Sequence, residues 1–268
     1  MHAITCYPSP NKKKGLAICE AFAKGAGGTC AEPGTDILAD GAAVFYGMTE
    51  HTLPLITQCR HERRDWYYID NAYYYGRGTY YRITKDRLMH DGIGVEVDPD
   101  FPLINWFGVD IRPWREPNAG PIVVTTQSEL FYRFRMRMTR DQWIKDVIRD
   151  IRIYTDRPIE VCNKPDPKDM AKTDPHSREF EPMMRNAWAL VTHSSSTAVK
   201  ALADGVPVFW LGLGDDYATA RHMSRHTVAA IEKPLYAEAR AWFIEALLSQ
   251  QWTIDEMRGG QAWFDLCE

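Results

Sequence analysis

The stretch Ala187–Phe209 reads AWALVTHSSSTAVKALADGVPVF, and it decides the fold class. Its first five residues, Ala187–Val191, are apolar and predict a buried strand. A helical pattern then begins at Ser196 and stops at Gly205, because glycine commonly ends helices. Val206–Trp210 predicts a second buried strand. A strand, a short polar turn, a helix and a further strand, in this order, predict a parallel sheet with a crossover helix.

The polar turn between the first strand and the helix, Thr192–Ser196, contains three consecutive serines after His193. Its hydroxyls and free backbone N–H groups face the positive end of the helix dipole, which favours an anion. Serine is also a routine helix cap, and capping is the alternative interpretation. Three consecutive hydroxyl residues exceed what one cap needs, so we predict an anion site here.

The same alternation of strands and helices runs through the rest of the chain. The expected strands are Ile4–Tyr7, Ala42–Tyr46, Trp66–Ile69, Thr79–Thr84, Pro121–Thr126 and Pro158–Cys162. The expected helices are Lys12–Lys24, Thr52–Arg63, Thr139–Tyr154, Glu179–Asn186, Tyr236–Gln250 and Ile254–Phe264.

The clearest turn cluster, Glu116–Gly120, follows a long aromatic, glycine-rich and proline-rich connection over residues 72–114. We place a domain boundary in this cluster. The sequence therefore predicts an α/β protein of two Rossmann-like β/α/β domains, residues 1–118 and 119–268, that face a cleft. Ligands in such sheets bind at the carboxyl ends of the strands.

The composition of the 268 residues is that of an ordinary globular protein, with 45% hydrophobic residues and a formal net charge of −4. This charge predicts no bulk attraction to nucleic acid. The six cysteines lie far apart, without a C-x-x-C pair, so we expect reduced thiols and no zinc site. The chain begins without a signal-peptide pattern and has no run of eighteen apolar residues, so we expect a soluble cytoplasmic protein with no membrane partner.

The run from His193 to Val208 resembles the nucleotide-sugar motif in the C-terminal domain of GT-B glycosyltransferases. In that family a strand, a serine-rich turn and a helix bind the diphosphate of the donor. Lys200 stands where these enzymes commonly have the glutamate that holds the donor ribose. The resemblance implies a GT-B-like fold with a C-terminal donor domain, and a nucleotide sugar, a UDP-sugar in the first instance, as co-substrate.

Three runs in the N-terminal half, Val44–Thr49, Asp65–Gly76 and Tyr80–Lys85, resemble short phage-encoded GT-B-like proteins. Some of these proteins are associated with glycosylation of hydroxymethylated DNA bases. The resemblance implies transfer of a hexose or pentose to a 5-hydroxymethylated pyrimidine, such as hydroxymethylcytosine, in double-stranded phage DNA. It also implies a place in the host cytoplasm.

Cations and hydroxyls beside the serine-rich turn complete the expected donor site. Lys164 follows one predicted strand, Arg185 precedes another, and the run Thr126–Ser128 ends the first strand of the second half. A solvated surface charge or an ordinary cap is the alternative for each. The predicted donor-binding residues are Thr126, Ser128, Lys164, Arg185, His193, Ser194, Ser195, Ser196, Thr197 and Lys200.

Glycosyl transfer to a hydroxyl needs a base for the acceptor oxygen. Asp70 directly ends an apolar strand and is our preferred base; Glu50 and His51, which follow Ala42–Tyr46, are the other candidates. An Asx-turn is the structural alternative for Asp70. The D-x-D spacing of Asp98–Asp100 lies in a proline-rich loop without a preceding strand, so we interpret it as a turn and predict metal-independent chemistry.

The stretch Arg60–His90 interleaves basic residues with tyrosines, as expected where phosphates are positioned and an extruded base is stacked. Core packing and a solvated face are the alternative. The predicted acceptor-binding residues are Tyr74, Arg77, Arg82 and Lys85. A second basic run, Arg133–Arg140, alternates arginine with apolar residues and predicts an extended segment with one charged face.

Two other functions stay open at this point. The same chemistry on a glycan or small molecule would not need the basic residues of Arg60–His90. A non-catalytic nucleotide-binding or DNA-binding protein of the same fold would bind nucleotide without turnover.

Overall fold

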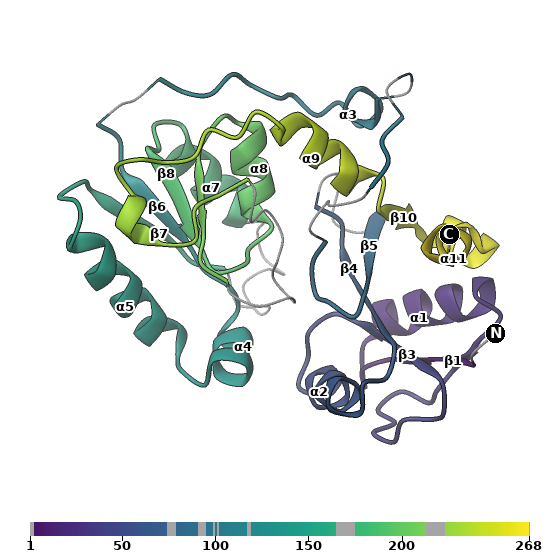
Figure 1. Ribbon diagram of the computed structural model, residues 1–268. Helices are drawn as coiled ribbons and strands as arrows, with labels where there is room; N and C mark the ends of the chain where they lie inside the picture. Colours follow the sequence, from purple (N-terminus) through teal and green to yellow (C-terminus); the bar gives the residue numbers. More distant parts are fainter. Residues whose placement is uncertain are drawn as a thin grey trace. The chain divides into compact units, whose positions relative to one another are not determined.

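The computed structural model describes residues 3–73, 79–90, 95–98, 100, 102–116, 119–164, 175–212 and 223–267, with residues 175–179 described by their backbone alone. The chain forms two compact units (Figure 1). Unit 1 consists of Met1–His90 and Leu248–Glu268, and unit 2 consists of Asp91–Leu247.

Unit 1 is built on a mixed sheet with the strand order β10-β5-β4-β3-β1-β2. Strands β1 to β4 run parallel, β5 runs antiparallel to β4, and β10 runs antiparallel to β5. The strands are β1 (Ile4–Tyr7), β2 (Thr29–Cys30), β3 (Ala42–Tyr46), β4 (Trp66–Asn71), β5 (Tyr80–Lys85) and β10 (Gln251–Thr253).

The helices of unit 1 are α1 (Lys13–Gly25), α2 (Thr52–Glu62), α10 (Ile254–Gly259) and α11 (Gln261–Cys267). The apolar face of α1 packs in a core with β1, β3, β4 and β5. Trp263 of α11 lies edge-on to Phe22 at 6.1 Å and to Tyr67 at 5.4 Å, measured between ring centroids. The two C-terminal helices therefore pack against the same hydrophobic core as α1.

These contacts place the domain boundaries differently from the predicted limits at residues 118 and 119. The closing segment from Leu248 belongs to unit 1, and the chain from Asp91 belongs to unit 2. The physical reason is burial: Trp252 is 6% exposed and Met257 and Ala262 are fully buried within the core of unit 1. Nothing local in the sequence tells which sheet a C-terminal amphipathic helix covers.

Unit 2 is built on a fully parallel sheet with the order β7-β6-β8-β9. Its strands are β6 (Ile122–Thr125), β7 (Ile159–Cys162), β8 (Ala189–Thr192) and β9 (Val208–Trp210). Its helices are α3 (Leu103–Trp106), α4 (Glu129–Phe131), a π-helical turn η1 (Tyr132–Met136), α5 (Arg140–Arg152), α7 (Pro175–Met184), α8 (Thr197–Ala203), the 3-10 turn η3 (Val228–Ala230) and α9 (Arg240–Leu248). None of the helices in the described part of the chain has the length and apolar character that a membrane span needs.

The predicted fold class is confirmed, since each unit is a layered α/β structure on a parallel or largely parallel sheet. One local prediction is wrong: the segment expected to be extended from Arg133 forms η1. The helical turn buries Tyr132 completely, and the Tyr132 ring packs on Trp143 with centroids 5.2 Å apart. Burial of this aromatic residue overrides the alternating pattern of the arginines.

Candidate functional site

The carboxyl ends of β6 and β8 lie side by side in unit 2, because Thr125 and Thr192 are partners in register. The Thr192 hydroxyl donates to the Thr125 carbonyl at 3.0 Å. The Thr125 and Thr197 hydroxyls form a hydrogen bond of 3.1 Å. These bonds join the end of β6 to the start of α8, so the strand end and the first turn of the helix form one structure.

The serine-rich turn supplies both a cap and an exposed hydroxyl. Ser195 Oγ accepts hydrogen bonds from Thr197 N at 3.3 Å and from Thr197 Oγ1 at 2.9 Å. Ser195 therefore caps α8, although Ser196 stands at the formal cap position, where it makes no side-chain cap bond and is exposed. Capping thus explains one serine of the three.

Ser194 belongs to a second, buried group with His193 and Gln127. The Ser194 hydroxyl bonds His193 Nδ1 at 3.0 Å and accepts from Gln127 Nε2 at 3.3 Å. The imidazole lies edge-on to Phe131, with ring centroids 5.0 Å apart. Burial, aided by the charge of Arg135, lowers the pKa of His193 to about 4. The imidazole is therefore neutral at pH 7, and this group offers hydrogen bonds without charge.

The sequence analysis placed Gln127 in the run Thr126–Ser128 and Arg135 in the second basic run, but it did not predict their interactions with Ser194 and His193. Gln127 reaches a serine 67 residues away in the chain, a contact that no local pattern shows. Its position directly after β6 is the only signal, because residues there face the ligand edge of a parallel sheet.

The neighbouring strand ends bring three more predicted residues to this edge. Thr126 Oγ1 accepts from Lys164 N at 3.0 Å and donates to Asn163 Oδ1 at 3.2 Å. Ser128 caps α4 by accepting from Phe131 N at 3.3 Å. Each hydroxyl thus has a structural bond, and the three residues still line the edge that carries the serine-rich turn.

The structure does not bring Arg185 and Lys200 to this edge. Helix α8 runs from the carboxyl edge back toward the amino edge, as a crossover helix must. Lys200 lies one turn below Thr197 and pairs with Glu181 at 2.5 Å. Arg185 follows the end of α7 and precedes β8, so it lies at the amino edge of the sheet.

In unit 1, Asp70 lies near the carboxyl end of β4 and is held by three donors. Its Oδ2 pairs with Arg82 Nη2 at 2.9 Å and accepts from the Tyr68 hydroxyl at 3.3 Å, and its Oδ1 accepts from Asn71 N at 2.8 Å. The Asp70 side chain is 30% exposed. The bond from Asn71 N is the Asx-type contact expected as an alternative, and it coexists with a partly exposed carboxylate.

Arg82 lies beneath this carboxylate, with 7% of its side chain exposed and its guanidinium 4.4 Å from the centroid of the Tyr73 ring. Burial disfavours its charge, but Tyr73 and Asp70 together raise the pKa of Arg82. Arg82 is therefore charged in the folded protein and forms a charge-assisted hydrogen bond with Asp70.

The two other candidate bases lie at the start of α2. Thr49, rather than Glu50, caps this helix, because Thr49 Oγ1 accepts from Thr52 N at 3.0 Å. Glu50 is exposed. His51 Nε2 bonds the Thr35 carbonyl at 2.9 Å, so one ring nitrogen is engaged within the protein. The Ser9 hydroxyl forms a hydrogen bond of 2.9 Å with the Thr49 hydroxyl. The buried set of hydroxyls formed by Ser9, Thr49 and Thr52 was not predicted from the sequence.

Of the predicted acceptor-binding residues, Tyr74 and Arg77 lie outside the described part of the structure. Arg82 is buried in its pair with Asp70, and Lys85 pairs with Asp65 at 3.0 Å. The two described cations thus have partners within unit 1. In the ranges that the structure describes, no three His, Cys, Asp or Glu side chains gather as a metal-binding group.

Comparison with known proteins gives a match at the level of the fold. No model of a known protein family matches the sequence, and no curated protein sequence matches it.

Two solved structures from Thermosulfurimonas dismutans are similar to this chain. The KpsC beta Kdo 2,7 transferase matches with a TM-score of 0.54 at 11% identity, over 100% of both chains. The KpsC beta Kdo 2,4 transferase matches with a TM-score of 0.51 at 10% identity, over 92% of this chain and 90% of that chain. Both neighbours are Kdo transferases by name, and the chain shares their fold.

Proposed function

We propose that this protein is a glycosyltransferase that moves a sugar from a nucleotide-sugar donor to a hydroxyl acceptor. Unit 2 binds the donor and unit 1 presents the acceptor. The observation that carries the proposal is the hydrogen-bonding array at the carboxyl edge of unit 2, formed by Gln127, Ser194 and the capped start of α8. Parallel sheets bind ligands at this edge, and the fold is one that sugar transferases use.

The donor half of the proposal assigns the phosphate groups to the serine-rich turn. Ser196 faces solvent there, and the buried hydroxyl of Ser194, bonded to neutral His193, supports the turn from within. Uncharged donors fixed before the reaction stabilise a departing phosphate without reorganisation. Lys164 and Arg135 supply positive charge near the same edge. A UDP-sugar is the first donor to test, and we propose that transfer needs no metal ion.

The acceptor half of the proposal assigns the base to Asp70. Its Oδ1 accepts one hydrogen bond, from Asn71 N, so a lone-pair position on this oxygen stays available for an acceptor hydroxyl. The ion pair with Arg82 fixes the orientation of the carboxylate. Positioned general bases of this kind contribute about a hundredfold or more to rate. Glu50 and His51 remain the other candidates.

Two classes of hydroxyl are candidates for the acceptor. A 5-hydroxymethylated pyrimidine in double-stranded DNA is one candidate, and its support is the basic, tyrosine-rich stretch Arg60–His90. The pairs Arg82–Asp70 and Lys85–Asp65 engage two of the four predicted contact residues. That observation favours a second candidate, a glycan or small-molecule hydroxyl, which needs no phosphate contacts from this stretch.

A transfer assay tests the proposal. The protein is incubated with a panel of nucleotide sugars, with and without EDTA, and with hydroxymethylated DNA, oligosaccharides or simple glycosides as acceptors. Mass spectrometry of the digested DNA or of the glycans then identifies both sugar and acceptor by the mass gained. The proposal predicts a sugar increment on one acceptor class. Nucleotide binding with neither transfer nor donor hydrolysis would instead identify a non-catalytic binding protein.

Two variants test whether a loss of donor affinity comes from the serine-rich turn or from any added surface charge. Ser196→Asp places a negative charge at the exposed serine of the turn, and we expect donor affinity to fall at least tenfold because like charges repel. Thr57→Asp adds the same charge at an exposed position on α2. This control should bind donor as the wild type does, and an equal loss in both variants would contradict the donor site.

A further inference from the structure

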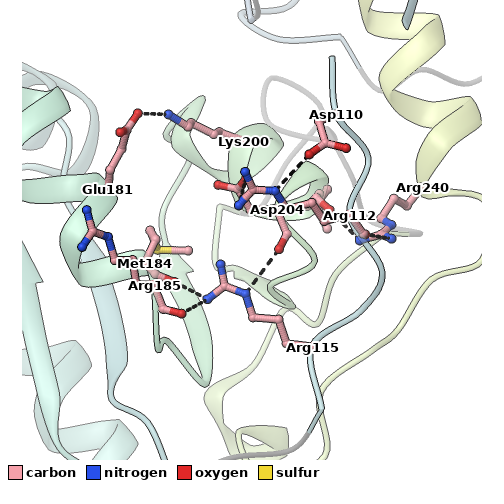
Figure 2. Close-up of polar contacts among 10 residues, drawn as sticks. Asp110, Arg112, Arg115, Glu181, Met184, Arg185, Lys200, Asp204 and Arg240 are labelled. Atoms are coloured by element: carbon pink, nitrogen blue, oxygen red, sulfur yellow. Dashed lines mark hydrogen bonds and ion pairs between the residues drawn. The ribbon is translucent and has the colours of Figure 1, made fainter. Parts of the chain in front are cut away.

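The amino edge of unit 2 carries a polar pocket with a volume of about 570 Å³. Six charged side chains line it: Arg112, Arg115, Glu181, Arg185, Lys200 and Asp204 (Figure 2). Arg185 and Asp204 follow the ends of α7 and α8, and both helices end at the edge where β8 and β9 begin. The pocket therefore lies at the opposite edge of the sheet from the serine-rich turn.

Backbone hydrogen bonds hold one wall of this pocket in place. Arg112 N donates to Ala203 O at 2.8 Å, and Arg115 N donates to Gly205 O at 3.0 Å. The segment Arg112–Arg115, here called the strap, is thereby pinned to the end of α8. An added Cβ on Gly205 would lie 2.0 Å from the Pro113 carbonyl oxygen, so strap and helix end are in direct contact.

The Arg115 side chain joins the ends of both helices. Its Nη1 donates to the carbonyls of Met184 and Arg185, and its Nε donates to the Asp204 carbonyl at 3.3 Å (Figure 2). Helix ends leave carbonyls without partners, and Arg115 satisfies three at once. The guanidinium is thus a fixed part of the pocket frame.

The charges of the pocket do not balance within it. Four cations face two carboxylates, Glu181 and Asp204. The Lys200–Glu181 pair is exposed, with 41% and 54% of the two side chains accessible, and such pairs exchange readily with other ions. A third carboxylate, Asp110, lies outside the lining and pairs with Arg112 Nε at 3.1 Å, while Arg112 Nη1 lies 3.7 Å from Asp204 Oδ1 (Figure 2). Arg185 is exposed and makes no side-chain ion pair with any residue that the structure describes.

We propose that this pocket binds a small phosphate-bearing anion at a site separate from the donor turn. With Asp110 counted, the four cations still outnumber the nearby carboxylates, which favours an anion such as a phosphate monoester. Guanidinium groups, such as the exposed Arg185, bind phosphate oxygens in pairs. The volume falls within the range of small-molecule sites. Along α8, the pocket residue Lys200 lies four residues after Ser196, a rise of about 6 Å, and Asp204 lies at the far end of the helix.

Calorimetric titration with inorganic pyrophosphate at low ionic strength tests the proposal. The wild-type chain should show two binding events, one at each edge of unit 2. Arg185→Glu and Lys200→Glu should each weaken the same event, the one at the amino edge, at least tenfold. Lys145→Glu, which makes the same charge change on the exposed face of α5, should leave it unchanged. Ser196→Asp should weaken only the other event.

The outcomes separate this site from the donor site. A single event that Arg185→Glu removes and Ser196→Asp leaves intact supports the pocket and contradicts the donor turn. Two results overturn the pocket. One is a single binding event that Ser196→Asp removes. The other is pyrophosphate binding that Arg185→Glu and Lys200→Glu weaken no more than the control Lys145→Glu does. Absence of any pyrophosphate binding also overturns it.

Discussion

The two units place charge at different edges of their sheets. In unit 1 a salt bridge, Asp70 with buried Arg82, lies at the carboxyl edge. In unit 2 the buried polar side chains described at the carboxyl edge are hydroxyls and the neutral imidazole of His193, and a cluster of ionic side chains lies at the amino edge instead.

The proposed function uses this difference, with different chemistry at the carboxyl edges of the two sheets. A carboxylate fixed by a buried guanidinium suits proton transfer at a bound hydroxyl. An uncharged array of hydrogen-bond donors suits a group that arrives with its own negative charge. The comparison can be tested by disturbing each charged or neutral group in turn.

The largest loss of stability is expected from Gly205→Ala, which disturbs the ionic edge of unit 2. Gly205 has φ +76° and would place its Cβ 2.0 Å from the Pro113 carbonyl oxygen. Left-handed backbone costs alanine about 1 to 2 kcal/mol, and the clash adds to it, so we expect a loss of about 3 kcal/mol in the free energy of unfolding. Urea denaturation measures it.

Gly259→Ala is the matched control, because no atom lies within 4 Å of an added Cβ there. It should leave stability unchanged or raise it by up to about 1 kcal/mol, since alanine favours helix. Equal stability of the two variants would show that the strap does not pin the end of α8.

Arg82→Met is expected to cost slightly less, because it leaves Asp70 without its partner. Breaking a buried ion pair costs about 3 to 5 kcal/mol, and partial exposure of Asp70 places the loss near 2 to 3 kcal/mol. Lys85→Met breaks the exposed pair with Asp65 and should cost less than about 1 kcal/mol. If urea denaturation gives both variants the same stability, the charged edge of unit 1 is not a fixed structure.

His193 gives an effect that is absent at pH 7 and appears only at lower pH. Burial lowers the pKa of His193 from an ordinary value of 6.5 to about 4. Between these values the unfolded chain binds a proton that the folded chain does not, so stability is full above pH 6.5 and falls as the pH approaches 4. The loss at pH 5 is about 2 kcal/mol by linkage.

His193→Gln removes this proton and should flatten the corresponding part of the stability profile between pH 4 and 6.5. Urea denaturation of both proteins across this range measures the difference. The NMR signals of His193 are identified by their loss in His193→Gln. If these signals titrate near pH 6.5, the neutral edge of unit 2 is contradicted.

Elements with a complete local pattern were predicted well from the sequence. Strand β3 has the predicted bounds, Ala42–Tyr46, since an apolar run between turn residues defines both its ends. Helix α8 ends before Gly205, as expected for a glycine with positive φ after a helix. The serine-rich turn was also located, because its hydroxyls follow directly after an apolar strand.

Contacts between distant parts of the chain were not predictable. Strand β10 and the helices after it join unit 1 through Trp252 and Met257, which contact residues more than 150 positions away. Gln127 and Arg115 act through partners about 70 residues distant. The position of Arg185 and Lys200 away from the carboxyl edge could have been predicted from the sequence, because a crossover helix must return to the amino edge.

Asp70→Asn tests the central claim most directly, with transfer rate and donor affinity measured on the same preparation. The substitution keeps the shape of the side chain and removes its capacity to take a proton. Circular dichroism confirms that the variant is folded, and Glu50→Gln is compared in parallel. We predict a loss of about a hundredfold or more in transfer with unchanged donor affinity. Undiminished transfer by folded Asp70→Asn would contradict the account.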